Sequence, residues 1–165
     1  NRRKRRKQVS NYDDFSRAKY AAFFYLGRKA LTESELRQKL RKKEYPPEVC
    51  EKTIDYLKEL SYIDDTDYAA RYAKDAAGLK KHGAARIQRD LARKGISPEI
   101  AEHAVASLEI DDGENLRSII EKKRERLDLA DAKQKNRLIG YLARRGYRYD
   151  EIYSALRETE EADFD

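Results

Sequence analysis

The hydrophobic residues of this sequence recur in the same order three times, at an offset of 51 residues. Two sets of aliphatic positions align without a gap: Leu36 with Ile87 and Leu138, and Leu40 with Leu91 and Leu142. Self-similarity at a fixed period is the sequence signature of a repeat protein. We therefore expect three tandem copies of one structural unit.

Within the first copy, the local pattern predicts three helices. Residues 17–30 form a helical run with apolar side chains on one face. Thr32, followed three residues later by Glu35, is the capping-box pattern that starts a second helix. Pro46 and Pro47 end that helix and favour the first turn of a third, because proline is tolerated where no amide donor is needed.

The other two copies carry equivalent signals with different residues. Gly83 is expected to open the middle helix of the second copy, and Gly95 to end it in a left-handed conformation. Ser97 can cap the helix that follows. In the third copy, Asp131 and Gln134 form a capping pair one turn early, which predicts a longer middle helix.

These signals predict an all-α fold of three tandem three-helix repeats. A unit of this size buries too little apolar surface to be stable alone, so the repeats are expected to stack into an elongated, curved array. We expect repeats at 17–65, 66–112 and 113–158, preceded by a basic, flexible arm at 1–16 and followed by an acidic tail at 159–165.

The sign of the net charge favours a polyanionic partner, and the alternative is a well-mixed charged surface without such a partner. The chain has 37 Lys and Arg against 31 Asp and Glu, a net charge of +6, and every residue at 2–7 is basic. No apolar run is long enough to cross a bilayer, so no membrane association is expected. The single cysteine, Cys50, fits a reducing compartment such as the cytoplasm. Because there is no methionine, we expect the natural start to be missing.

Enzymatic signatures are absent from the sequence. There is no glycine-rich phosphate loop, nucleophile motif or metal-ligand spacing, so neither a cofactor nor a metal is expected. His82 and His103 are assigned to surface or boundary positions, and Cys50 to an apolar helix face. The acidic pairs 64–65 and 111–112 precede helices, where capping explains them. We therefore expect a non-enzymatic binding protein.

The candidate binding residues are cations on the middle helices and in one connection. They are Arg37, Arg41, Lys42, Lys43, Lys80, Lys81, Arg86, Arg89, Arg93, Lys94, Arg137, Arg144 and Arg145. Equivalent positions should project alike from successive repeats: Lys42 with Arg93 and Arg144, and Lys43 with Lys94 and Arg145. Such rows could follow a phosphate backbone or an acidic protein groove. Alternatively, the cations could be solvated residues that are stabilised by the negative end of each helix dipole. Most of the 12 tyrosines are expected to pack in the core or between repeats.

Several separate motifs, in the same order, resemble the RecX family of recombinase regulators. They lie at 30–36, 60–65, 68–72, 83–91, 94–97 and 142–147. The similarity covers roughly residues 17–157. Glu44 and Ser61 stand where the family pattern usually has glycine, so they mark the two turns at which this chain departs from it.

The resemblance implies a function that the residues alone do not. RecX proteins are helical modulators that bind the RecA recombinase filament on single-stranded DNA and suppress filament growth, ATP hydrolysis and strand exchange. It thus implies a role in recombination and DNA repair for a monomer that contacts single-stranded DNA directly or through RecA. The alternatives are an independent DNA-binding protein that uses helix pairs and a basic face, and a scaffold without nucleic acid.

Overall fold

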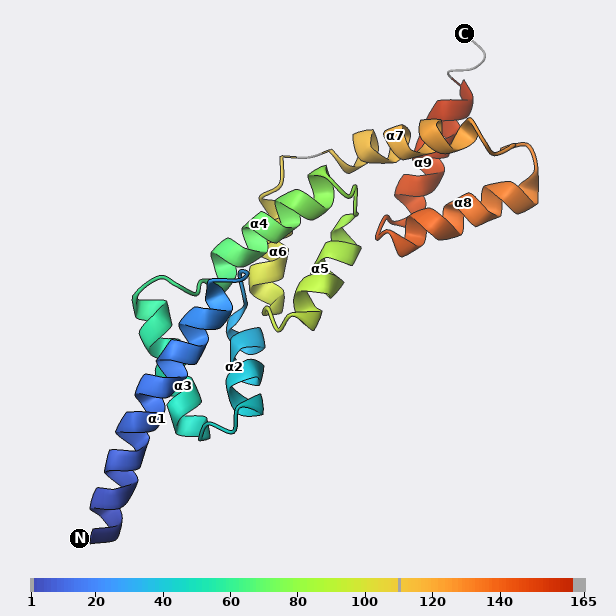
Figure 1. The fold of residues 1–165 in the computed structure, drawn as a ribbon. Helices are drawn as coiled ribbons and strands as arrows, with labels where there is room; N and C mark the ends of the chain where they lie inside the picture. Colours follow the sequence, from blue (N-terminus) through green and yellow to red (C-terminus); the bar gives the residue numbers. More distant parts are fainter. Residues whose placement is uncertain (1, 110, 162–165) are drawn as a thin grey trace.

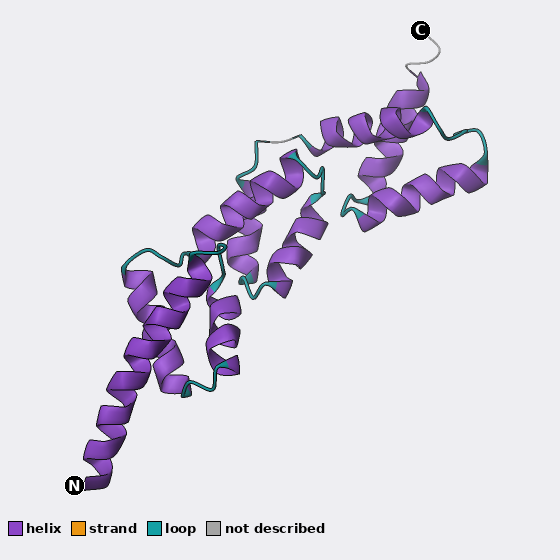
Figure 2. Cartoon of the chain, in the orientation of Figure 1, coloured by secondary structure: helices purple, strands orange, loops and turns teal. Residues whose placement is uncertain are grey.

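The computed structural model describes the backbone of residues 2–109 and 111–161, and the side chains of 13–109, 111–159 and 161. These residues form helices joined by short loops, without strands (Figure 2). The helices are α1 (Arg2–Leu26), α2 (Glu33–Lys42), α3 (Pro47–Glu59), α4 (Asp65–Gly78), α5 (Ala84–Arg93), α6 (Pro98–Ala106), α7 (Asp112–Arg124), α8 (Ala132–Arg144) and α9 (Tyr149–Glu161). They make three successive three-helix bundles in an elongated, bent row (Figure 1). The predicted fold class is confirmed.

Each bundle has its own hydrophobic core, and the middle helix of each supplies equivalent residues to it. Two aliphatic side chains per middle helix are almost completely buried: Leu36 and Leu40 in α2, Ile87 and Leu91 in α5, and Leu138 and Leu142 in α8. They lie in three separate clusters, one for each repeat. The periodicity of the sequence therefore corresponds to three copies of one packing arrangement.

The helix starts follow the predicted caps. The Thr32 hydroxyl accepts a hydrogen bond from the Glu35 amide at 3.1 Å, and the Glu35 carboxylate accepts from the Thr32 amide. Ser97 caps α6. Asp131 caps α8, which has 13 residues against 10 in α2 and α5, so the longer middle helix of the third repeat is confirmed.

The first helix differs from the prediction at both ends. It begins at Arg2, so its backbone includes the segment assigned to an arm, and it ends at Leu26 instead of residue 30. Phe15 explains why the helix begins before residue 17: its ring packs edge-on against Tyr56 of α3 with centroids 6.0 Å apart. The ammonium group of Lys52 lies 4.4 Å from the centre of the same ring. These contacts anchor α1 before the predicted start at residue 17.

The turn after each middle helix has the same left-handed backbone conformation. The residue at this position is Glu44, Gly95 or Gly146, with φ of 60°, 78° and 96° respectively. Ser61 also adopts a positive φ, of 57°. The two turns that depart from the family pattern therefore keep a conformation that favours glycine, at the energetic cost that a side chain incurs there.

Candidate partner-binding surface

The middle helices of successive repeats stack end to end, with the start of one against the end of the next. At the first junction, the Thr32 hydroxyl donates to the Lys94 carbonyl at 2.6 Å, and the Lys94 ammonium donates to the Glu35 carboxylate at 3.1 Å. At the second junction, the Gly83 amide donates to the Arg145 carbonyl at 2.8 Å. The Thr32 and Gly83 hydrogen bonds each pair the electropositive start of one helix with a carbonyl at the electronegative end of another.

Glycine is required where these helix ends meet. A Cβ atom on Gly95 would overlap the side chain of Ser34, and one on Gly146 would overlap the backbone nitrogen of Arg86. Glu44 holds the equivalent position in the first repeat, at the outer end of the stack, and its side chain is exposed. The family's usual glycine is therefore replaceable at Glu44, because none of the three described repeats packs its helix start against that turn.

The two acidic pairs connect the repeats as well as capping helices. Asp64 and Asp111 cap α4 and α7, as expected from their position. Asp65 instead accepts a hydrogen bond from the first amide of α2 at 2.9 Å. Asp112 faces the first amide of α5, and this amide lowers the pKa of the carboxyl against the larger effect of burial. In each pair, one carboxylate thus serves its own helix and the other holds the preceding repeat.

Replacing both Asp65 and Asp112 with asparagine is expected to raise stability at neutral pH. Burial raises the pKa of each carboxyl, so the folded state is favoured while the groups are protonated and loses this advantage as pH rises through the folded pKa. Asparagine keeps a hydrogen-bond acceptor without the partly buried charge. Urea unfolding across pH should give an advantage for the variant at pH 7 that disappears below about pH 4.

The matched control replaces the exposed partners Asp64 and Asp111 with asparagine, which is an equally good cap. It reports the effect of removing two exposed charges from the same turns. If the Asp65 and Asp112 double variant instead lost stability at every pH, the charged hydrogen bond would outweigh burial, and the linkage argument would be incorrect.

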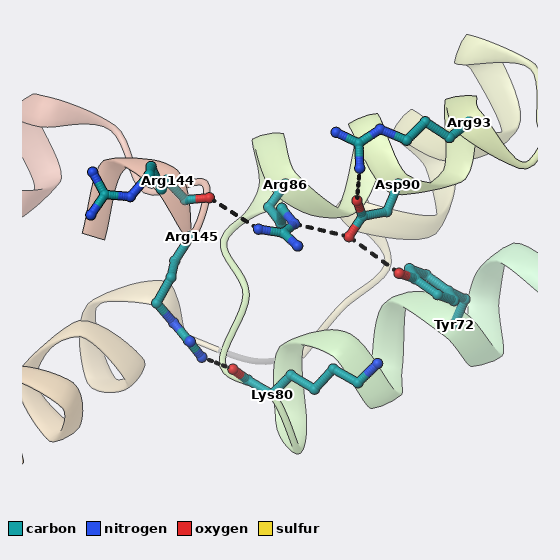
Figure 3. Close-up of polar contacts among 7 residues, drawn as sticks. All are labelled: Tyr72, Lys80, Arg86, Asp90, Arg93, Arg144 and Arg145. Atoms are coloured by element: carbon teal, nitrogen blue, oxygen red, sulfur yellow. Dashed lines mark hydrogen bonds and ion pairs between the residues drawn. The ribbon is translucent and has the colours of Figure 1, made fainter. Parts of the chain in front are cut away.

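A buried carboxylate organises the cations at the second junction (Figure 3). Asp90 accepts from the Arg86 side chain at 3.1 Å, from the Tyr72 hydroxyl at 3.2 Å and from Arg93 at 3.3 Å. Burial opposes its charge, but the hydrogen bond from Arg86 leads the interactions that lower its pKa overall. Arg86 also donates to the Arg144 carbonyl at 3.3 Å, which links α5 to α8.

The connection between α4 and α5 is held to the third repeat by two further cations. The Arg145 guanidinium lies 5.4 Å from the centre of the Tyr141 ring and donates to the Lys80 carbonyl. The Lys81 ammonium donates to the Ser118 hydroxyl of α7 at 2.6 Å. Arg145 and Lys81 therefore stabilise the junction between the second and third repeats.

Five of the predicted binding cations are partly buried and have contacts within or between repeats: Arg37, Lys81, Arg86, Lys94 and Arg145. Arg93 also pairs with Asp90, but its side chain is exposed. The row of Lys43, Lys94 and Arg145 does not project alike. The hydroxyl of Tyr68 and then the Glu35 carboxylate raise the pKa of Lys94, against the effect of burial. Lys43 is exposed because its helix end is the outer end of the stack.

The remaining predicted cations are exposed: Arg41, Lys42, Lys43, Lys80, Arg89, Arg93, Arg137 and Arg144. Lys42, Arg93 and Arg144 are the last residues of α2, α5 and α8. We call these three the terminal row. Because the junctions fix the middle helices end to end, the terminal row presents one exposed cation from each repeat.

A groove of about 480 Å³ lies beside the terminal row at the second junction. Its apolar lining comes from α5, α6 and the end of α8, and from Ile96 and Tyr147 in the turns after α5 and α8. Arg89 and Arg148 add positive charge to it. Burial raises the pKa of Tyr147, which keeps its hydroxyl protonated as a donor to the Lys81 carbonyl.

Comparisons with known proteins identify the family. The models of the RecX first, second and third three-helix domains match residues 18–57, 64–105 and 110–156. The regulatory protein RecX of Clostridium botulinum strain Alaska E43 is 32% identical over 162 residues, covering 96% of this chain and 76% of the relative. The chain belongs to the RecX family.

Other RecX proteins agree with this assignment. Regulatory protein RecX of Mycolicibacterium smegmatis is 32% identical, over 78% of this chain and 71% of the relative. The crystal structure of RecX from Lactobacillus salivarius matches with a TM-score of 0.82 at 29% identity, covering 90% of this chain and 98% of that one. A second RecX crystal structure, at 21% identity and a TM-score of 0.76, shares the fold.

Two features of this RecX-family surface were not predicted from the sequence. The groove at the second junction combines residues from two repeats. Its lining residue Arg148 was not predicted, because the candidate cations were taken from the middle helices and the connection before the second of them. The pairing of Asp90 with three side chains was hidden as well, although its spacing from Arg86 and Arg93 on one helix face could have indicated it. In the part of the chain that the structure describes, no helix is long and apolar enough to cross a membrane.

Proposed function

We propose that this chain binds RecA filaments on single-stranded DNA and inhibits filament growth, ATP hydrolysis and strand exchange, without chemistry of its own. Membership of the RecX regulatory family supports a role in regulation. The observation that carries the mechanism is the terminal row, with one exposed cation at the same place in each stacked repeat. The protein would act as a cytoplasmic monomer.

A filament is a suitable partner for such a row because its protein subunits and DNA phosphates also repeat. One exposed cation contributes little binding energy alone, since water and salt screen it. Cations joined by rigid junctions act together, because the first contact raises the effective concentration of the next. The junction hydrogen bonds therefore support binding indirectly, by keeping the repeats in register.

The chemistry of the described residues supports a binding role. Burial raises the pKa of the Cys50 thiol, so the reactive thiolate is disfavoured. Cys50 is fully buried in the core of the first repeat. No cluster of side chains with metal-ligand chemistry occurs among residues with described positions.

The proposal predicts that substoichiometric amounts of the protein lower RecA ATP hydrolysis on single-stranded DNA and shorten its filaments. A coupled ATPase assay and electron microscopy measure the two effects. Unchanged hydrolysis and unchanged filament length would rule the proposal out. The alternative of an independent DNA-binding protein requires tight, sequence-dependent binding to naked duplex DNA that falls steeply with salt.

A further inference from the structure

Helix α1 exposes two aromatic rings on one face. Tyr20 is 78% exposed and Phe24 is 52% exposed. Residues four apart on a helix are neighbours, so the two rings lie about 6 Å apart along the axis. Large exposed aromatic side chains that are grouped in this way indicate a binding surface more often than single ones do.

The two rings line a hollow that also contains cations. Its volume is about 570 Å³, and it lies between α1 and the turn after α2. The lining residues are Ser16, Arg17, Tyr20, Ala21, Phe24, Tyr25, Lys43 and Tyr45. Two of them are cations and none is a carboxylate. We call this surface the α1 aromatic face.

Cations also stack on rings of the α1 aromatic face. The Arg28 guanidinium lies 4.5 Å from the centre of the Phe24 ring, and the Lys39 ammonium lies 4.8 Å from that of Tyr25. The side chain of Arg17 is 67% exposed, and its ion pair with Asp14 is long, at 3.9 Å. The exposed rings are therefore surrounded by positive charge.

We propose that the α1 aromatic face binds a single strand of DNA. Bases stack on Tyr20 and Phe24, while Arg17 and Lys43 attract the phosphates. Stacking on aromatic rings tolerates any base sequence and needs unpaired bases, which a duplex does not offer. The inference rests on the proposed function in one respect, since that function makes single-stranded DNA the available nucleic acid.

The geometry favours a base over an acidic protein segment as the occupant. A carboxylate would satisfy Arg17 or Lys43 but would leave the Tyr20 ring in water. A nucleotide satisfies both parts of the surface, because it joins a planar aromatic base to a phosphate. Lys43 is also the exposed cation at the outer end of the stack, so the α1 aromatic face adjoins the start of the terminal row.

Helix α9 provides an internal control. Tyr149 and Tyr153 are 60% and 49% exposed and have the same four-residue spacing. Their neighbours in sequence include Arg148, Asp150 and Glu151, and Arg148 pairs with Asp150 at 3.0 Å. This pair of rings therefore lacks the excess of positive charge that surrounds the α1 aromatic face. If rings alone were sufficient, both pairs would bind DNA equally well.

The test uses a fluorescently labelled oligothymidylate and no recombinase, so its failure is distinct from failure of the ATPase experiment. The double variant Tyr20→Ala and Phe24→Ala should bind at least about tenfold more weakly in fluorescence anisotropy. Tyr149→Ala with Tyr153→Ala should bind like the unmodified chain. Arg17→Gln with Lys43→Gln should reduce the dependence of log affinity on log salt by about 0.7 for each charge.

An abasic strand separates stacking from charge. With this probe, the unmodified chain and the Tyr20 and Phe24 double variant should bind equally weakly, since no bases remain to stack. Circular dichroism should show equal helical content for all variants. Oligothymidylate binding unaffected by loss of the two rings would overturn the proposal. If those rings proved necessary only for RecA inhibition, the surface would contact protein instead.

Discussion

Replacing Gly146 with alanine is expected to lower the free energy of unfolding by about 2–4 kcal/mol. Part of the loss comes from the left-handed backbone at φ 96°, which disfavours any side chain. The rest comes from overlap between the new methyl group and the Arg86 backbone at the second junction. Urea unfolding followed by circular dichroism measures the change.

The first repeat contains the matched control for this substitution. Glu44 has the same turn conformation but no neighbouring repeat, so Glu44→Ala should change stability little. Glu44→Gly should raise stability by about 1 kcal/mol, because it removes the side chain from a left-handed position. The difference between these two variants isolates the turn. If the stability difference between Glu44→Ala and Glu44→Gly equalled the stability lost in Gly146→Ala, overlap at the junction would contribute nothing to that loss.

Reversing the terminal row, with Lys42, Arg93 and Arg144 all changed to glutamate, is expected to abolish most inhibition of RecA. The protein concentration that halves ATP hydrolysis should rise at least about tenfold, which corresponds to about 1.4 kcal/mol. The reason is that three attractive contacts become repulsive along one row. Lys42, Arg93 and Arg144 are exposed, but Arg93→Glu also removes a donor to the buried Asp90 carboxylate. Some loss of stability is therefore expected, and inhibition is compared at a temperature where circular dichroism shows native helical content.

A second triple variant with the same change in net charge serves as the control. Lys29, Lys74 and Arg157 are exposed cations, one from each predicted repeat and all outside the terminal row. Changing them to glutamate also takes the net charge from +6 to 0. Equal loss of inhibition in the two triple variants would mean that inhibition depends on overall charge, and that the terminal row has no special role.

Local signals made much of the fold predictable. Thr32 and Ser97 cap helices because a hydroxyl needs only the amides two or three residues away. The buried positions of Leu36 and Ile87 follow from helical periodicity. These features depend on neighbours in the sequence, so they did not require knowledge of how the repeats pack.

The roles of the cations depend on contacts between repeats and could not be predicted in this way. Lys43, Lys94 and Arg145 are equivalent in sequence, yet Lys94 and Arg145 lie at junctions while Lys43 is exposed. The difference arises because, among the described residues, the end of α2 has no neighbouring repeat, whereas the ends of α5 and α8 each meet one. Asp65 was likewise predicted to cap its own helix, but it bonds to the preceding repeat.

The central claim is that rigid junctions hold three repeats in register against a filament. Its most direct test is RecA ATPase inhibition by Gly146→Ala, at a temperature where circular dichroism shows native helical content. X-ray scattering should show altered overall dimensions, and the account predicts that inhibition is then strongly reduced. Full inhibition by a variant whose repeats have lost their register would contradict it.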